Sequence, residues 1–251
     1  MDQSNQDIFL RKLESALSDV SENLRNTASS ATPGEGDGVQ TSLDPIIQRT
    51  RNERLALLEN LIAESRSINL DVVPVKDMDA AGDQIKQLVI TKQPERGVPK
   101  EVVAWKHPIM ESLDLEKRLK EISVPVFFTE FKNHKEKALL REKITHAFIG
   151  VTSADFCLAD SATLVMKTRP GQARSVSLAP SIHVAVISLE QILADLNELY
   201  ARLKYDTAHQ KEGLTRCLTF VTGPSKTADI EAIMVYGVHG PREVHLYVIT
   251  G

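Results

Sequence analysis

The amino-acid sequence predicts one α/β domain with a mixed, mostly parallel sheet. Short apolar runs bounded by turn residues alternate with longer segments whose apolar residues recur every three or four positions. This alternation is typical of βαβ units, in which helices cover both faces of the sheet. The chain has 251 residues, of which 42% are hydrophobic and 25% are charged, as expected for an ordinary globular protein.

The first 43 residues are predicted to form a helical segment, residues 1–26, and a linker, residues 27–43. Apolar residues alternate at spacings of three and four over residues 7–25, which is typical of an amphipathic helix. They are Leu10, Leu13, Leu17, Val20 and Leu24. This seam packs either on the chain's own domain or on a partner subunit, and the second case would give an oligomer. The linker is rich in small and polar residues, so we expect it to be flexible.

Residues 44–251 form the predicted α/β domain. Helices are expected where apolar residues recur at helical spacing, over residues 44–61, 80–88, 115–122, 135–147 and 189–203. Strands are expected at short apolar runs, over residues 71–75, 102–105, 124–128, 148–151, 162–167, 183–187, 218–222, 232–238 and 244–249. The last two strands are joined by too few residues for a parallel crossover, so we expect a C-terminal antiparallel hairpin.

Composition and charge exclude several classes of function. The net charge is −4, so neither a nucleic acid nor an anionic membrane surface is an expected partner. No stretch reaches the roughly 18 apolar residues of a membrane span, and residues 1–25 do not resemble a signal peptide, so we expect a cytoplasmic protein. The two cysteines, Cys157 and Cys217, lack metal-ligand spacing. We therefore expect reduced thiols, and neither a metal nor an iron–sulfur cluster in this chain.

The strongest local signal is the run Thr-Gly-Pro-Ser-Lys-Thr-Ala-Asp-Ile at residues 222–230. It follows a predicted strand, and we expect a turn and then a helix over 228–232, capped by the hydroxyl of Ser225 or Thr227. Backbone amides at a helix N-terminus, with a lysine beside them, suit a phosphate, a carboxylate or a sulfate. The alternative is a plain strand–turn–helix joint with a solvated lysine. The candidate ligand-binding residues of this run are Gly223, Ser225, Lys226, Thr227 and Asp229.

A second motif, Gly-Val-His-Gly-Pro-Arg-Glu-Val-His at residues 237–245, combines turn residues with His239 and Arg242. A turn requires neither of these two side chains. His239 could transfer a proton and Arg242 could clamp an anion, and the alternative for both is a structural role. We expect Ser225 and Arg242 to face the same anion at one rim of the sheet, where they would form its binding site.

A third polar segment spans residues 150–163, where a strand runs into a polar loop and then a short turn of helix. Asp155 is expected to cap this turn, and Asp160 is either a base, a ligand-binding group or a partner of nearby backbone groups. Thr152, Ser161 and Thr163 are candidate ligand-binding residues. No motif names a nucleophile with its base, so His239 and Asp160 are the only candidates for catalysis.

The two C-terminal motifs together resemble the signature of the lactate-utilisation protein C family, also called the LUD domain family. Residues 150–155 and 159–163 are similar to the central motif of that family. The resemblance covers most of residues 43–251 and implies a three-layer fold like that of NagB, RpiA and the CoA transferases. It also implies a non-redox component of a system that oxidises L-lactate to pyruvate.

In such a system another subunit carries the iron–sulfur clusters, so the resemblance implies iron–sulfur partner subunits and membership of an L-lactate dehydrogenase complex. The ligand of this chain would be a small anionic metabolite, a carboxylate or a phosphate. The alternative is an independent metabolite-binding protein, or an enzyme like the sugar-phosphate isomerases and acyl transferases of this fold.

Overall fold

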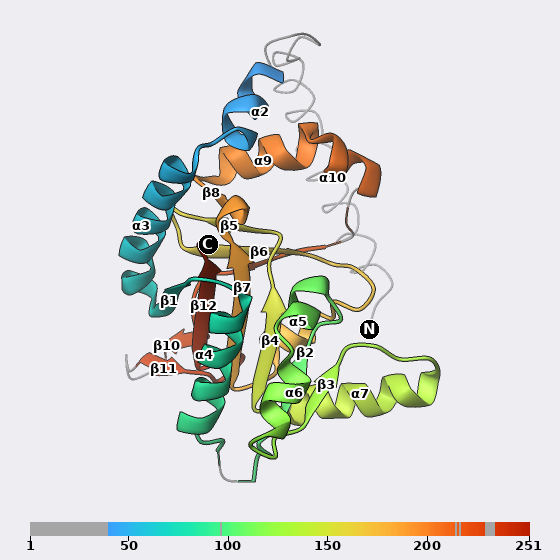
Figure 1. Cartoon of the computed structure of the whole chain (residues 1–251). Coiled ribbons are helices and arrows are strands. Elements are labelled where there is room, and N and C mark those ends of the chain that lie inside the picture. The colour runs from blue at the N-terminus through green and yellow to red at the C-terminus, as the bar shows by residue number, and fades with distance from the viewer. Residues whose placement is uncertain (1–39, 96, 214, 216, 229–233) are drawn as a thin grey trace, which may run out of the picture. The chain divides into compact units, whose positions relative to one another are not determined.

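The structure of the chain is a computed structural model that describes residues 40–251 except 96, 214, 216 and 229–233 (Figure 1). The predicted helix over 7–25 and residues 27–39 of the predicted linker lie outside the described residues. Residues Ser42–Gly251 pack together as one unit. Among the described residues, none of the helices has the length and apolar character that crossing a membrane requires.

The centre of the fold is a six-stranded sheet in which every neighbouring pair of strands is parallel. In spatial order its strands are β1 (Leu70–Val75), β12 (Glu243–Ile249), β7 (Ile182–Ser188), β4 (Ile149–Ser153), β2 (Val102–Ala104) and β3 (Val126–Phe128). The inner strands β4, β7 and β12 are almost wholly buried, as expected for a parallel sheet with covered faces. The predicted α/β fold with a mainly parallel sheet is confirmed.

A second, mixed sheet stands at the carboxyl ends of the central strands (Figure 1). Its strands, in spatial order, are β8 (Ile192–Leu193), β5 (Phe156–Leu158), β6 (Thr163–Lys167) and β9 (Leu218–Val221). Strand β4 leads directly into β5, so the polar loop between them joins the two sheets. Strand β5 corrects the predicted turn of helix before Asp160, because Phe156 and its neighbours pair with β6 instead.

Helices surround the sheets, and most of them begin at a side-chain cap. They are α2 (Gln40–Ile47), α3 (Arg51–Ile68), α4 (Met78–Thr91), α5 (Pro108–Ser112), α6 (Leu115–Lys120), α7 (His134–His146), α8 (Ser175–Leu178), α9 (Leu196–Tyr205) and α10 (Thr207–Glu212). The helix predicted over 44–61 is in fact two helices, because Thr50 and Glu53 form a capping box that starts α3. Helix α2 already begins at Gln40, inside the predicted linker.

The helix predicted over 189–203 is also divided. A 3₁₀ turn (Leu189–Gln191) and strand β8 come first, and α9 begins only after Asp195. The Asp195 carboxylate accepts hydrogen bonds from the backbone amides of Asn197 and Glu198, which fixes the helix start there. The apolar spacing that indicated one long helix therefore continues through a strand and a turn.

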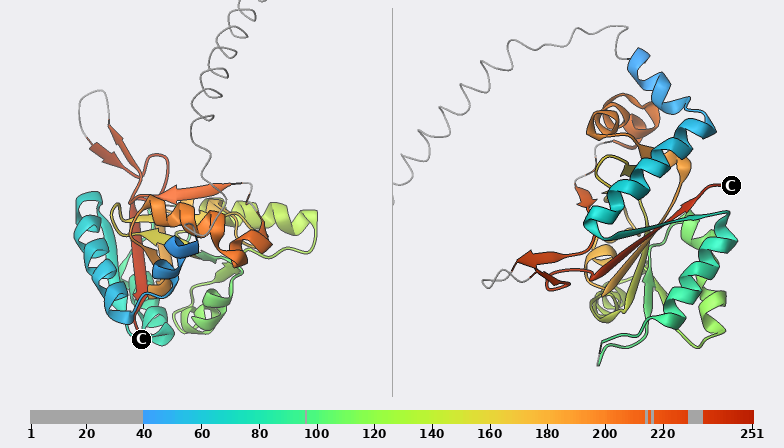
Figure 2. Two further views of the ribbon diagram at one scale, coloured as in Figure 1. Left: turned by 90° about the horizontal axis from the view of Figure 1, so that it is seen from above. Right: turned by 90° about the vertical axis from the view of Figure 1, so that its left-hand side faces the viewer.

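The C-terminal segments are arranged differently from the prediction. Strand β11 (Met234–Tyr236) pairs antiparallel with β10 (Lys226–Ala228), and β12 runs parallel between β1 and β7. The antiparallel hairpin is thus β10–β11, a ribbon that projects from the central sheet (Figure 2). The helix expected over 228–232 is wrong at Ala228, which ends β10, and residues 229–232 lie outside the described residues.

Gly223 explains how the chain enters this ribbon. Its φ of 73° is in the left-handed region, and a Cβ atom there would lie 2.6 Å from the carbonyl oxygen of Ile68. Only glycine fits both conditions, and the turn that it makes lies just before β10.

Candidate functional site

The strand order places a switch point between β2 and β4. From β2 the chain moves outward to β3, whereas from β4 it moves in the opposite direction, to β7. In open α/β sheets, ligands bind at the carboxyl ends of the strands beside such a point. Trp105, Lys106 and His107 follow β2, and Ala154 and Asp155 follow β4.

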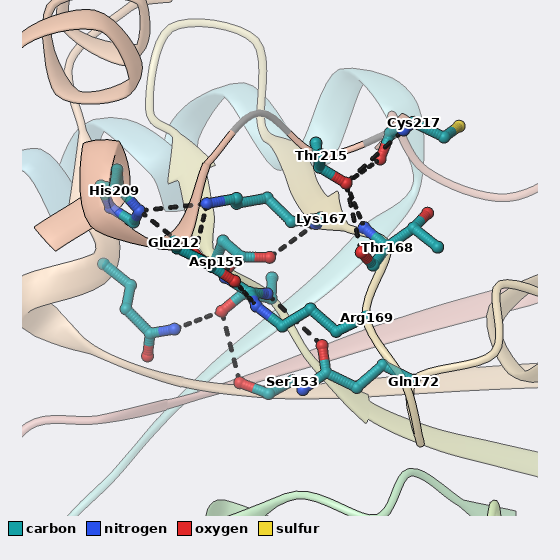
Figure 3. A network of polar contacts seen from close by, with 12 residues as sticks. Ser153, Asp155, Lys167, Thr168, Arg169, Gln172, His209, Glu212, Thr215 and Cys217 are labelled. Atoms are coloured by element: carbon teal, nitrogen blue, oxygen red, sulfur yellow. Dashed lines mark hydrogen bonds and ion pairs between the residues drawn. The ribbon is translucent and has the colours of Figure 1, made fainter.

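Asp155 organises the polar residues at this edge (Figure 3). Its Oδ2 accepts a hydrogen bond of 2.6 Å from the backbone amide of Lys167, and its Oδ1 lies 2.6 Å from Nη2 of Arg169. The Asp155 side chain is 9% exposed. This carboxylate therefore fixes the end of β6 and orients the arginine that follows it. Asp155 therefore has a structural role, as expected, because it holds the end of β6 in place. It caps no helix.

A second carboxylate, Glu212, reaches the same place from α10 (Figure 3). It accepts hydrogen bonds from Nε and Nη2 of Arg169, the second at 2.9 Å, and from the ammonium group of Lys167. The Lys167 side chain is only 2% exposed. We call Asp155, Lys167, Arg169, His209 and Glu212 the carboxyl-edge cluster.

Electrostatics in the carboxyl-edge cluster are balanced between two cations and two carboxylates. Hydrogen bonds from Arg169 and then Lys167 lower the pKa of Glu212 to about 2. His209, whose Nδ1 lies 3.3 Å from Nζ of Lys167, has its pKa lowered by burial and by that cation. Burial also lowers the pKa of His107, and the charge of Asp155 opposes this effect. Both imidazoles are therefore neutral near pH 7, and the positive charge resides on Lys167 and Arg169.

Such a cluster can bind a carboxylate. A guanidinium offers two parallel N–H donors that match the two oxygens of a carboxylate, and a neighbouring ammonium adds a third. Sequence reasoning missed Lys167, Arg169, His209 and Glu212. The one sequence signal for this cluster is the position of Lys167. A lysine that ends the buried run Thr163–Lys167 needs a partner of opposite charge.

The low pKa of Glu212 predicts a pH dependence of stability. Because the folded-state pKa lies below the usual 4.5, the ion pairs of Glu212 stabilise the fold above that pH, and this contribution is lost as the pH falls toward 2. We expect the difference in unfolding free energy between wild type and Glu212→Gln to shrink as the pH is lowered from about 5 to about 3 in urea titrations. A difference that stays constant over this range would contradict the assignment.

The residues predicted from the two C-terminal motifs lie at the opposite, amino rim of the central sheet. The two loops do meet there: the Ser225 amide donates to the Pro241 carbonyl at 2.8 Å, and the Gly237 amide donates to the Ser225 carbonyl at 3.0 Å. Arg242 then directly precedes β12. The Ser225 amide is therefore engaged, and it does not begin a helix.

The side chains at this amino rim are also engaged. Arg242 forms an ion pair of 3.1 Å with Glu95, and the Lys226 ammonium lies 6.0 Å from the centre of the Tyr236 ring. His239 is exposed, and Thr227 is half-buried. A cavity of about 270 Å³ there is lined by Asn69, Asp71, Pro224, Tyr236, Arg242, Glu243, Val244 and His245. Its two carboxylates offset the arginine, so an anion site here stays a prediction, and Asp229 lies outside the described residues.

The candidates of the central motif are distributed over the fold. Thr152 is fully buried, and its Oγ1 lies 2.8 Å from Nε2 of His183. Thr163 Oγ1 lies 2.8 Å from Oγ1 of Thr222, which joins β6 to the end of β9. Asp160 is exposed in the β5–β6 turn, and Ser161 beside it is half-buried. A ligand role for these residues stays a prediction.

Among the described residues, no group of three or more His, Cys, Asp and Glu side chains is arranged to hold a metal ion. Cys157 is buried and Cys217 is half-buried, and both are free thiols. Burial raises the pKa of the Cys157 thiol well above its usual range, so this cysteine is unreactive.

Residues 58–249 match the family described as LUD domain. A protein of Halalkalibacterium halodurans named lactate utilization protein C is 30% identical over 237 residues, which cover 93% of this chain and 95% of the relative. A protein of Macrococcus caseolyticus with the same name is 28% identical and covers 77% of this chain and 78% of the relative. A solved structure of a DUF162 family protein from Deinococcus radiodurans has a TM-score of 0.49 at 20% identity, covering 80% of this chain and 99% of that one.

Proposed function

This chain belongs to the LUD domain family, and from its relatives named lactate utilization protein C we propose that it is a non-redox component of an L-lactate utilisation system. In this role it binds a small carboxylate and associates with subunits that carry iron–sulfur clusters. The chain has two cysteines, whereas a cluster usually requires four thiolates, so the proposal assigns electron transfer to the partner subunits.

One observation supports carboxylate binding above the others. At the switch-point edge of the sheet, Arg169 directs two N–H donors and Lys167 directs its ammonium toward one carboxylate position, which Glu212 occupies. L-lactate and pyruvate both carry one carboxylate of this kind. The donor arrangement of the carboxyl-edge cluster therefore supports carboxylate binding as part of the proposed function.

In a Glu212→Gln background, where no internal carboxylate occupies the same donors, replacing Arg169 by lysine is expected to weaken carboxylate binding at least tenfold. The variant keeps the positive charge but loses the paired donors, and a hydrogen bond to a charged group contributes about 1.5–3 kcal/mol. Binding of L-lactate, pyruvate and inorganic phosphate would be measured by isothermal titration calorimetry and by the shift in thermal unfolding.

The matched control is Arg242→Lys, the same substitution at the amino rim. It is expected to leave the affinity unchanged, as is Lys226→Ala. If these two variants abolish binding and Arg169→Lys does not, the ligand site is the one predicted from the C-terminal motifs and the carboxyl-edge cluster is excluded.

Association with partners needs a separate test. The tagged full-length chain is expected to co-purify with iron–sulfur subunits, and deletion of the chain is expected to abolish lactate-dependent electron transfer. A chain that stays monomeric beside those subunits and is dispensable for that electron transfer would refute the proposed role.

A further inference from the structure

We propose that Glu212 is an internal carboxylate that occupies the ligand's position, and that a small monocarboxylate binds by displacing it from Arg169 and Lys167 as α10 moves away. This inference rests on the proposed function, because it assigns the place and the mode of carboxylate binding. In this arrangement α10 acts as a lid, and Glu212 acts as the competitor that keeps the site closed in the absence of a ligand.

The pose of Glu212 is that of a bound carboxylate. Its two oxygens accept from Nε and Nη2 of the same guanidinium, and the Lys167 ammonium completes the set. These contacts join residues 43 and 45 positions apart in the chain, so no local turn geometry imposes them. A free carboxylate placed on these three donors would adopt the same arrangement.

Apart from the contacts of Glu212, α10 is held by a few polar contacts, among them the hydrogen bond of 2.8 Å from Nε2 of Gln210 to the Lys204 carbonyl. None of its six residues, all of them described, is buried. The Glu212 side chain is 35% exposed, whereas Lys167 beneath it is 2% exposed. The ring of His209 touches the edge of Phe156 at 5.1 Å between centroids. Because the helix is short and buries little apolar surface, the ion pairs of Glu212 are the main cost of opening it, and α10 can leave while the sheets stay intact.

Charge balance determines what can replace Glu212. If α10 left alone, the buried Lys167 ammonium would lose its carboxylate, and an unpaired buried charge is strongly destabilising. A monocarboxylate restores the same charge, whereas a phosphate dianion adds one negative charge beside Asp155. The cluster therefore favours a monocarboxylate, and opening of α10 is coupled to its arrival.

If Glu212 and the ligand compete for the same donors, a variant with a weaker competitor at position 212 should bind the ligand more tightly. In Glu212→Gln the neutral amide competes poorly for Arg169 and Lys167, so we expect this variant to bind pyruvate about tenfold more tightly than wild type, measured by calorimetry. The matched control is Glu198→Gln. Glu198 also pairs with an arginine, Arg49, but it lies on α9 and is not part of the carboxyl-edge cluster. The control is expected to bind pyruvate as wild type does.

Hydrogen exchange tests the lid directly. Saturating pyruvate is expected to accelerate exchange of the backbone amides over 207–213 in the wild-type protein, and Glu212→Gln is expected to accelerate it without pyruvate. Slower exchange on adding pyruvate, or equal or weaker pyruvate binding by Glu212→Gln, would overturn the inference.

The outcomes separate this inference from the proposed function. If Arg169→Lys weakens pyruvate binding in the Glu212→Gln background but Glu212→Gln alone does not strengthen it over wild type, the site stands and Glu212 is not its competitor. If neither the wild-type protein nor Glu212→Gln binds pyruvate, both the site and the lid are refuted. Binding of inorganic phosphate in preference to pyruvate would refute the monocarboxylate class.

Discussion

Replacing Gly150 by alanine is expected to destabilise the protein by about 3 kcal/mol, because a methyl group has no space there. Gly150 lies in β4, at the centre of the parallel sheet. A Cβ atom built on it would lie 1.9 Å from the carbonyl oxygen of Val176 and 2.9 Å from Cγ of Pro180. The close atom belongs to the backbone of α8, so the helix must move away from the sheet to admit the side chain.

Urea denaturation would measure this loss, and Gly97→Ala provides the comparison. Gly97 has a φ of 88°, and no atom lies within 4 Å of the place that a methyl group would take there. Alanine at this position is strained only in its backbone, at a cost of about 1 kcal/mol. Equal losses of stability for the two variants would show that helix α8 does not press on β4 as described.

Replacing Asp155 by alanine is expected to destabilise the protein by about 3 kcal/mol or more. The substitution removes two charge-assisted hydrogen bonds at once, to the Lys167 amide and to Arg169. The amide is left without an acceptor in a buried place, and the arginine loses the group that orients it.

Asp155→Asn is the informative control for this loss. The asparagine oxygen can still accept from the Lys167 amide, but it carries no charge for Arg169. Thermal and urea unfolding are expected to show about half of the destabilisation caused by alanine. If asparagine and alanine are equally damaging, the ion pair with Arg169 accounts for the whole effect, and the bracing of β6 by Asp155 is refuted.

The sequence predicted the central sheet well because its strands are short apolar runs with turn residues on both sides. Runs such as 183–187 contain few features that resemble a helix. Errors arose where one pattern fits two structures. The apolar spacing over 189–203 is helical, but Asp195 starts the helix and Ile192 pairs with Cys157 in the second sheet. A Ser or Thr after Gly-Pro suits both a helix cap and the entrance to a strand.

The carboxyl-edge cluster was harder to predict for a different reason. Lys167, Arg169 and Glu212 come together only because β6 and α10 fold onto the same edge, over 43 to 45 positions of the chain. Nothing in the local sequence of α10 marks Glu212, which resembles the many solvated carboxylates of the chain. In contrast, the sequence did predict that the loops around Ser225 and Pro241 meet. It did not predict that they meet at the amino rim of the central sheet, because that depends on the direction in which β12 runs.

The position of β12 has a consequence for the order in which the sheet can be assembled. Strand β1 pairs with β12 and with no other strand of the described sheet, and paired residues such as Asp71 and His245 are 174 positions apart. During synthesis on the ribosome, β1 and β7 must therefore wait with open edges until β12 has emerged. Because such edges favour wrong pairing, nascent chains that stall before β12 should be the ones that most need chaperones.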